Sequence, residues 1–151
     1  MSTIEMGEPI YEYTVNITGM PEYGVSFEEL MTGKTQVPPE GARFDVAFAG
    51  EVSGSKLSGT VTGVDYLHIR ADGRFQLDIH AEITTKDGQK ISLKADGVAN
   101  PRKDSTISDL RENVTLFSSS KDCTWVNTIQ VWAIGTVDLA TKVICVAGYS
   151  V

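Results

Sequence analysis

Apolar and polar residues alternate without a break over residues 75–84. Alternation with a period of two is typical of a β-strand that buries one of its faces. One Asp-Gly pair precedes this segment at Asp72-Gly73, and another follows it at Asp87-Gly88. Because Asp-Gly between alternating runs favours a tight turn, residues 67–96 are expected to form two consecutive β-hairpins.

The register of the hairpins follows from the requirement that apolar residues lie opposite apolar residues. A two-residue loop at Asp87-Gly88 would place Ile83 opposite Ser92 and mix the two faces. A three-residue loop, in which Gly88 adopts the left-handed conformation and forms a bulge, places Ile83 opposite Ile91. The first hairpin gives the same result with Gly73. We therefore predict three-residue loops in both hairpins.

Similar patterns predict the other elements. Further strands are expected over residues 11–17, 44–48, 57–61, 114–117, 124–134 and 142–151. Ser26 and Glu29 have the spacing of a capping box, which predicts one or two helical turns, and residues 105–112 suggest a second short helix. Glycines at 50, 54, 59 and 63 permit the bulges and coiling that close a sheet.

These elements predict an all-β domain that occupies residues 1–151 as a single unit. The expected fold is an antiparallel β-barrel of about eight or nine strands with one or two short helices, and a sandwich is the second choice. A barrel of about eight strands has an interior that either fills with side chains or holds one small ligand.

The last predicted strand is apolar on both sides. Val143, Cys145 and Ala147 alternate with Ile144 and Val146, so neither face is suited to water. A helix of the same chain or a second subunit has to cover the outer face. Because the sequence offers so little helix, we favour a homodimer.

Charge and composition exclude several classes of partner. Thirteen basic and twenty acidic residues give a net charge of −7, which disfavours nucleic acid and anionic membranes as partners. No apolar run is long enough to span a membrane, and the acidic start of the chain does not resemble a signal peptide. Cys123 and Cys145 are interpreted as free thiols of a cytoplasmic protein.

The candidate chemistry lies on the polar face of the two hairpins. Asp78, His80 and Glu82 follow one another at every second position, and the predicted register places Tyr66 opposite Asp78. A carboxylate beside a phenol and an imidazole is a suitable set for proton transfer. Asp78 would be the base, and Tyr66 or His80 the donor to a developing oxyanion. His68 shares this face.

Two further residues are candidates for ligand binding. Trp125 and Asn127 share one face of their predicted strand, where an indole and an amide can flank a flat ligand. We expect no metal, because no second histidine lies within reach of the first. No phosphate-binding loop or dinucleotide fingerprint occurs, so no cofactor is expected.

Residues 41–91 carry an ordered set of short motifs. They are Gly50 with Gly54, Leu57-Ser58-Gly59, Asp65-Tyr66, Asp72-Gly73, Leu77-Asp78-Ile79, and Asp87-Gly88 with Ile91; Trp125-Val126-Asn127 and Gly135 follow later. This set resembles the family named domain of unknown function 3237. The resemblance implies a β-barrel of small bacterial proteins without an agreed biochemical role. It also implies that Asp65, Asp78 and Asn127 are central, which adds Asp65 to the ligand-binding candidates.

Two functional hypotheses remain open at this point. The first is a barrel that binds a small organic molecule and catalyses an isomerisation, cyclisation or dehydration by proton transfer without a cofactor. The second is a non-catalytic binding or assembly module with a filled barrel, in which the polar face is the solvated outer surface. The two hypotheses differ in whether the polar groups line an enclosed site.

Overall fold

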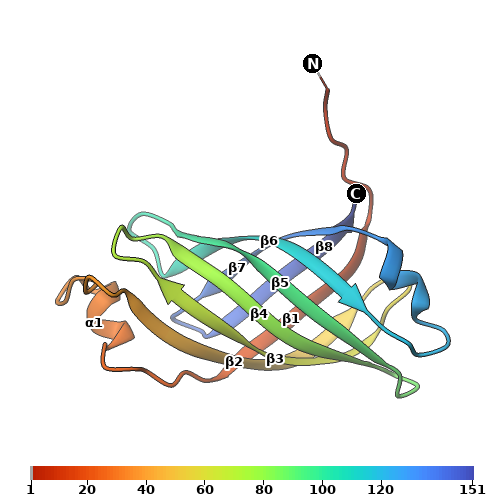
Figure 1. Ribbon diagram of the computed structural model, residues 1–151, viewed down its shortest axis with the longest axis horizontal. Coiled ribbons are helices and arrows are strands. Elements are labelled where there is room, and N and C mark those ends of the chain that lie inside the picture. Colours follow the sequence, from red (N-terminus) through yellow and green to blue (C-terminus); the bar gives the residue numbers. More distant parts are fainter. Residues whose placement is uncertain (1) are drawn as a thin grey trace.

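The computed structural model describes residues 2–151, which form one closed barrel of eight antiparallel strands (Figure 1). Each strand pairs with the next in the sequence, and the last pairs with the first. The strands are β1 (Pro9–Gly19), β2 (Ala42–Ser53), β3 (Gly59–Ile69), β4 (Phe75–Thr85), β5 (Lys90–Pro101), β6 (Ile107–Phe117), β7 (Val131–Asp138) and β8 (Val143–Ser150). The prediction of an all-β antiparallel barrel is confirmed.

Both hairpins have the predicted register. Ile83 pairs with Ile91, and Ile69 pairs with Phe75. Gly73 and Gly88 have φ angles of 92° and 87°, in the left-handed region that glycine tolerates best. The turn chemistry and the apolar alternation therefore select the same pairing.

Two segments differ from the prediction. Residues from Ile107 onward belong to β6 and not to a helix, because Leu110 and Glu112 continue the inward-facing series of this strand. The segment 124–134 is not one strand, since Thr124–Thr128 forms the short 3₁₀ helix η1 and β7 begins only at Val131. The N–H of Val126 donates to the Cys123 carbonyl (3.2 Å), a local turn bond that competes with strand pairing.

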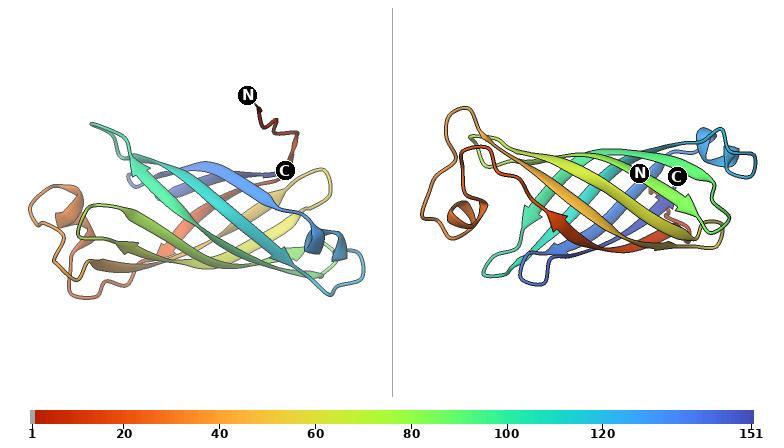
Figure 2. Two further views of the ribbon diagram at one scale, coloured as in Figure 1. Left: turned by 45° about the horizontal axis from the view of Figure 1, so that its top comes forward. Right: turned by 90° about the horizontal axis from the view of Figure 1, so that it is seen from below.

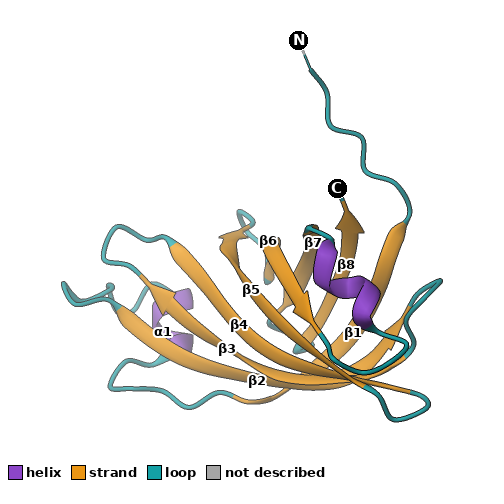
Figure 3. Ribbon diagram, turned by 45° about the vertical axis from the view of Figure 1, so that its right-hand side comes forward, coloured by secondary structure: helices purple, strands orange, loops and turns teal. Residues whose placement is uncertain are grey.

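The two short helices lie at opposite ends of the barrel (Figures 2 and 3). At one end is α1 (Phe27–Met31), whose predicted cap is confirmed because the N–H of Glu29 donates to Ser26 Oγ (3.2 Å). At the other end is η1. Neither helix covers the side of the barrel. Within residues 2–151, no helix has the length and apolar character needed to cross a bilayer.

The interior is filled in the half that is closest to η1. This half is packed by side chains that are at most 3% exposed, namely Tyr11, Val52, Val61, Ile83, Ile91, Leu93, Val114, Leu116, Val126 and Val131. The half closest to α1 is different, because a cavity remains between the strands there. The architecture therefore directs attention to the α1 end.

The outer face of β7 and β8 is apolar. Trp132 and Ile134 of β7 are 39% and 43% exposed. Cys145, also exposed, and the half-buried Ala147 of β8 lie beside them, whereas Val146 points into the barrel. The prediction that the outer side of the last strand is apolar is confirmed. The helices α1 and η1 lie at the two ends of the barrel, away from the middle of this face (Figure 1).

Candidate functional site

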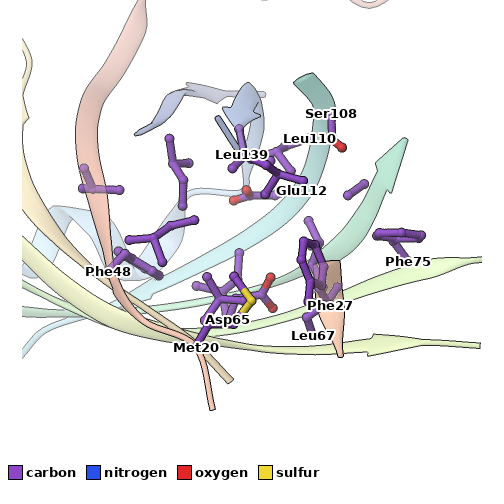
Figure 4. Close-up of a pocket in the computed structure, with 18 of the residues that line it drawn as sticks. Met20, Phe27, Phe48, Asp65, Leu67, Phe75, Ser108, Leu110, Glu112 and Leu139 are labelled. Atoms are coloured by element: carbon purple, nitrogen blue, oxygen red, sulfur yellow. The ribbon is translucent and has the colours of Figure 1, made fainter. Parts of the chain in front are cut away.

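Two carboxyl groups occupy inward-facing positions of the barrel wall. Asp65 lies on β3 between the inward-facing residues Val61 and Leu67, and Glu112 lies on β6 between Leu110 and Val114. Figure 4 shows both carboxyl groups pointing into the space between these strands. Acidic residues are rarely buried without a partner, so these positions mark a candidate site.

The cavity has a volume of about 70 Å³, well above the roughly 10–15 Å³ that a single water molecule requires. Its polar groups come from Tyr13, Asp65, Ser108 and Glu112. The rest of the lining is apolar and consists of Val15, Ile17, Met20, Phe27, Val46, Phe48, Leu67, Phe75, Leu77, Ile79, Ala99, Leu110, Val137, Leu139 and Ile144. An apolar cavity with a few convergent polar groups is the usual form of a small-molecule site.

Glu112 is buried and has one oxygen without a partner. Its side chain is 6% exposed, and Oε2 accepts no hydrogen bond. Burial raises the pKa of Glu112 to about 8, with a smaller contribution from the charge of Asp65. Because desolvation penalises the charged form, burial favours the protonated acid of Glu112, which can donate a proton.

Asp65 is held at an interruption of the β3–β4 ladder. Pairing is present at Asp65–Ile79 and again at His68–Gln76, but not at the two positions between them. The main-chain N–H of Asp78 donates to Asp65 Oδ1 instead (3.0 Å). Burial raises the pKa of Asp65 to about 7; the hydrogen bond from Asp78 opposes the increase, and the Asp78 charge adds to it. Near neutral pH, Asp65 is therefore divided between base and acid.

Tyr13 provides a phenol beside these carboxyl groups. The ring is 5% exposed and lines the cavity. Burial raises its pKa well above the usual value, and the charges of Glu112, Tyr11 and Asp65 raise it further. The hydroxyl consequently stays protonated and is available as a hydrogen-bond donor.

The structure places the whole predicted catalytic set, Asp78, His80 and Tyr66, on the outside of the barrel. Asp78 and His80 have 57% and 55% exposed side chains, with 3.2 Å between Asp78 Oδ1 and His80 Nε2. Tyr66 lies edge-on to the His80 ring, and His68 borders the same open groove. Glu82 is also exposed and pairs with Lys90. The structure brings Tyr66, Asp78 and His80 together, but not in the cavity.

Trp125 and Asn127 lie at the η1 end and do not line the cavity. Asn127 binds the main chain of Ser118 on both sides: its Oδ1 accepts the Ser118 N–H (2.9 Å), and its Nδ2 donates to the Ser118 carbonyl (2.7 Å). Trp125 is half-buried beneath Lys56, whose Nζ is 5.2 Å from the ring centroid. The structure therefore separates these two residues from Asp65.

The sequence analysis included Asp65 but missed Glu112, Tyr13 and Ser108. The available signal was a polar residue at an apolar position of an alternating strand. In β6 the series Leu110, Glu112, Val114 and Leu116 contains this signal. Within residues 2–151, no three His, Cys, Asp or Glu side chains are grouped in a way that could hold a metal ion.

The fold and the site define an eight-stranded antiparallel barrel with an acidic, otherwise apolar cavity. The chain belongs to the family described as protein of unknown function DUF3237, whose model matches residues 9–147. No curated protein matches the sequence.

Solved structures share the fold. A β-barrel-like protein from Acinetobacter baumannii is 17% identical, with a TM-score of 0.74 and coverage of 99% of this chain and 98% of that one. A protein of unknown function from Clostridium acetobutylicum is 20% identical, with a TM-score of 0.77 and coverage of 95% and 97%. An enzyme from Penicillium herquei is 19% identical, with a TM-score of 0.57 and coverage of 98% and 99%.

Proposed function

We propose that the barrel binds a small, uncharged, mainly apolar molecule in the α1-end cavity and catalyses a proton transfer within it. The observation that carries this proposal is the unpaired, buried Glu112 carboxyl, which shares an apolar cavity with Asp65. The two carboxyl groups can divide into a base and an acid, because Asp65 accepts the Asp78 N–H, a bond that favours its ionised form, whereas Glu112 Oε2 has no such donor.

In the proposed reaction, the Asp65 carboxylate removes a proton from a carbon next to a carbonyl group. Glu112 delivers its own proton to the oxygen or carbon where the electron pair settles, and the Tyr13 hydroxyl donates a hydrogen bond to the developing oxyanion. The product is an isomer of the substrate. One proton then passes from Asp65 to Glu112, directly or through solvent, and restores both groups.

The residues that line the cavity favour an uncharged substrate. No Lys, Arg or His side chain lines the cavity, so an anionic group would have no counter-ion there. Asp65 and Glu112 would repel such a group further when ionised. The fold is compatible with catalysis, since one solved relative is described as an enzyme.

A hydrogen-exchange assay tests this function directly. Small ketones with acidic C–H bonds are incubated with the protein in D₂O, and deuterium uptake is followed by NMR. We expect uptake above the buffer rate for ketones that bind, and its loss in Asp65→Asn and Glu112→Gln. Uptake that never exceeds the buffer rate, or that survives both substitutions, would contradict the proposal.

The same assay separates the cavity from the outer groove. The sequence-based hypothesis makes Asp78 the base, with Tyr66 or His80 as the donor. If Asp78→Asn abolishes exchange while Asp65→Asn preserves it, the reaction belongs to the groove and not to the cavity. The opposite result assigns it to the cavity.

We also propose that two copies associate through the outer face of β7 and β8. Glu12 on β1 lies on one side of this apolar face, and Arg111 on β6 lies on the other, beside Asp109, which is paired with Arg102. A two-fold axis parallel to the strands would bring Glu12 of one copy to Arg111 of the other. Sedimentation should give a dimer that Ile134→Glu dissociates, whereas Lys94→Glu on β5 leaves it intact. A monomeric wild-type protein would exclude this interface.

A further inference from the structure

The cavity ends at an aromatic floor in the middle of the barrel. Phe48 is 3% exposed and stacks on Tyr13, with 6.3 Å between ring centroids and 11° between ring planes. Tyr13 stacks in turn on Tyr11 at 6.0 Å and 4°. Phe48 and Tyr13 line the cavity, whereas Tyr11 does not. The aromatic rings therefore separate the cavity from the filled half.

The space beyond the floor is fully occupied. Val52, Val61 and Ile83 are at most 3% exposed and have no surface on the cavity. Because such packing leaves no room for a ligand, a bound molecule cannot extend past Phe48 without displacing it. Figure 4 shows Phe48 and Phe75 at opposite ends of the cavity.

Three of the four polar groups, Tyr13, Asp65 and Glu112, lie deeper in the cavity, whereas the α1 end is apolar apart from the Ser108 hydroxyl at the start of β6. Tyr13 forms part of the floor, and Asp65 pairs with Val46, which is two residues before Phe48 on β2, so the Asp65 carboxyl lies close to the floor as well. The mouth is lined by Phe27 and Leu139, which belong to the α1 end of the barrel. A ligand whose polar group contacts Asp65 and Glu112 therefore directs its apolar body toward α1, where Ser108 is the one polar residue among those that line the cavity.

We propose that Phe48 sets the depth of the site and restricts it to molecules whose polar group lies at or near one end. This inference rests on the proposed function, because it assumes that the ligand's polar group contacts Asp65 and Glu112. A polar group in the middle of a chain would require space on its far side, and the Phe48 ring occupies that space. Phe48 is thus a specificity-determining residue and not a catalytic one.

Two isomeric alcohols test the inference, because they share composition but differ in the position of the hydroxyl. Affinities for 1-hexanol and 3-hexanol are measured by NMR titration. We expect the wild type to prefer 1-hexanol, and Phe48→Ala to shift the affinity ratio toward 3-hexanol by about tenfold, at the lower end of the discrimination that one methylene group provides. Phe48→Leu should shift the ratio in the same direction by a smaller factor. This milder substitution keeps the test valid if the alanine variant does not fold.

Phe75→Ala is the matched control, because it removes an equal ring at the other end of the cavity. It should change both affinities together and leave their ratio unaltered. If both alcohols bind and Asp65→Asn weakens both, but neither Phe48 variant moves the ratio, the depth inference is wrong and the proposed site stands. If neither alcohol binds the wild type, the proposed site and this inference are both overturned.

Discussion

The main-chain N–H of Asp78 donates to Oδ1 of Asp65 across the interrupted part of the β3–β4 ladder (3.0 Å). This bond fixes one oxygen of the interior carboxyl group to the barrel wall and leaves Oδ2 for other contacts. It also relates two acidic residues whose side chains lie on opposite faces of the wall. Asp78 contributes to the cavity through its backbone, whatever its own side chain does outside.

The free energy of unfolding of the barrel should decrease as the pH rises from about 4 to about 8. The pKa values of Asp65 and Glu112 are raised to about 7 and about 8, from 3.8 and 4.5 when exposed. Within this window the folded state retains protons that the unfolded state has released. The contribution of these two carboxyl groups to stability is therefore complete below about pH 4. It is lost as the pH rises through their pKa values in the folded state. The slope is at most about 1.4 kcal/mol per pH unit for each group.

Urea unfolding of Asp65→Asn and Glu112→Gln at several pH values measures this contribution. Each substitution replaces a titrating group by a neutral amide, so each variant should show a shallower decline than the wild type. Asp45→Asn is a suitable control, because the Tyr23 hydroxyl and Arg43 lower the pKa of Asp45 and it stays ionised throughout the window. Identical slopes in all four proteins would mean that the two carboxyls titrate normally.

Glu112→Leu should stabilise the protein if Glu112 serves function and not the fold. The substitution removes a buried carboxyl with an unpaired oxygen and inserts an apolar group of similar size. We expect a gain of about 1–3 kcal/mol at pH 8 and a smaller gain at pH 5, where the carboxyl is already neutral. The control is Glu82→Leu on the outer face, which should change stability by less than about 0.5 kcal/mol. A strong loss of stability in Glu112→Leu would indicate a structural role.

The hairpins could be predicted because their signals, the Asp-Gly turns and the alternation of apolar and polar residues, lie within short stretches of the sequence. Gly73 and Gly88 required a left-handed turn, and Ile83 required an apolar partner. The relation between Asp65 and Glu112 is different, because only closure of the barrel brings β3 and β6 to face one cavity. No local pattern contains that information.

The polar composition of residues 105–112 also concealed the site. Ser105, Asp109 and Arg111 suggested a helix, although only every second residue faces solvent in β6. At the other end, Trp125-Val126-Asn127 alternates like a strand but is held in η1 by the turn bond at Cys123. In β6, pairing with β5 and β7 outweighed a weak local preference for helix, whereas in η1 a local turn bond outweighed the alternating pattern.

Tyr11→Phe should leave stability unchanged or raise it by up to about 1 kcal/mol. The Tyr11 hydroxyl is completely buried and has no hydrogen-bond partner. Its removal therefore eliminates the free-energy cost of burying an unpaired polar group. The ring itself is needed, since it packs so closely on Gly148 that a Cβ there would lie 2.4 Å from it. Tyr11→Ala should therefore cost about 3–5 kcal/mol. A loss of more than 1 kcal/mol in Tyr11→Phe would reveal a bonded hydroxyl, such as one that binds an internal water.

Asn127→Ala should destabilise the protein without weakening binding in the cavity. The Asn127 amide forms hydrogen bonds with both the N–H and the carbonyl of Ser118. Without the amide, these two main-chain groups lose their hydrogen-bond partner within the protein. We expect a cost of about 1–3 kcal/mol by urea unfolding and an unchanged affinity for 1-hexanol. Thr128→Ala is a matched control, because Thr128 is an exposed residue of the same helix. If Asn127→Ala instead weakens binding and leaves stability intact, Asn127 is a ligand-binding residue, as the sequence predicted, and the ligand site extends to the η1 end.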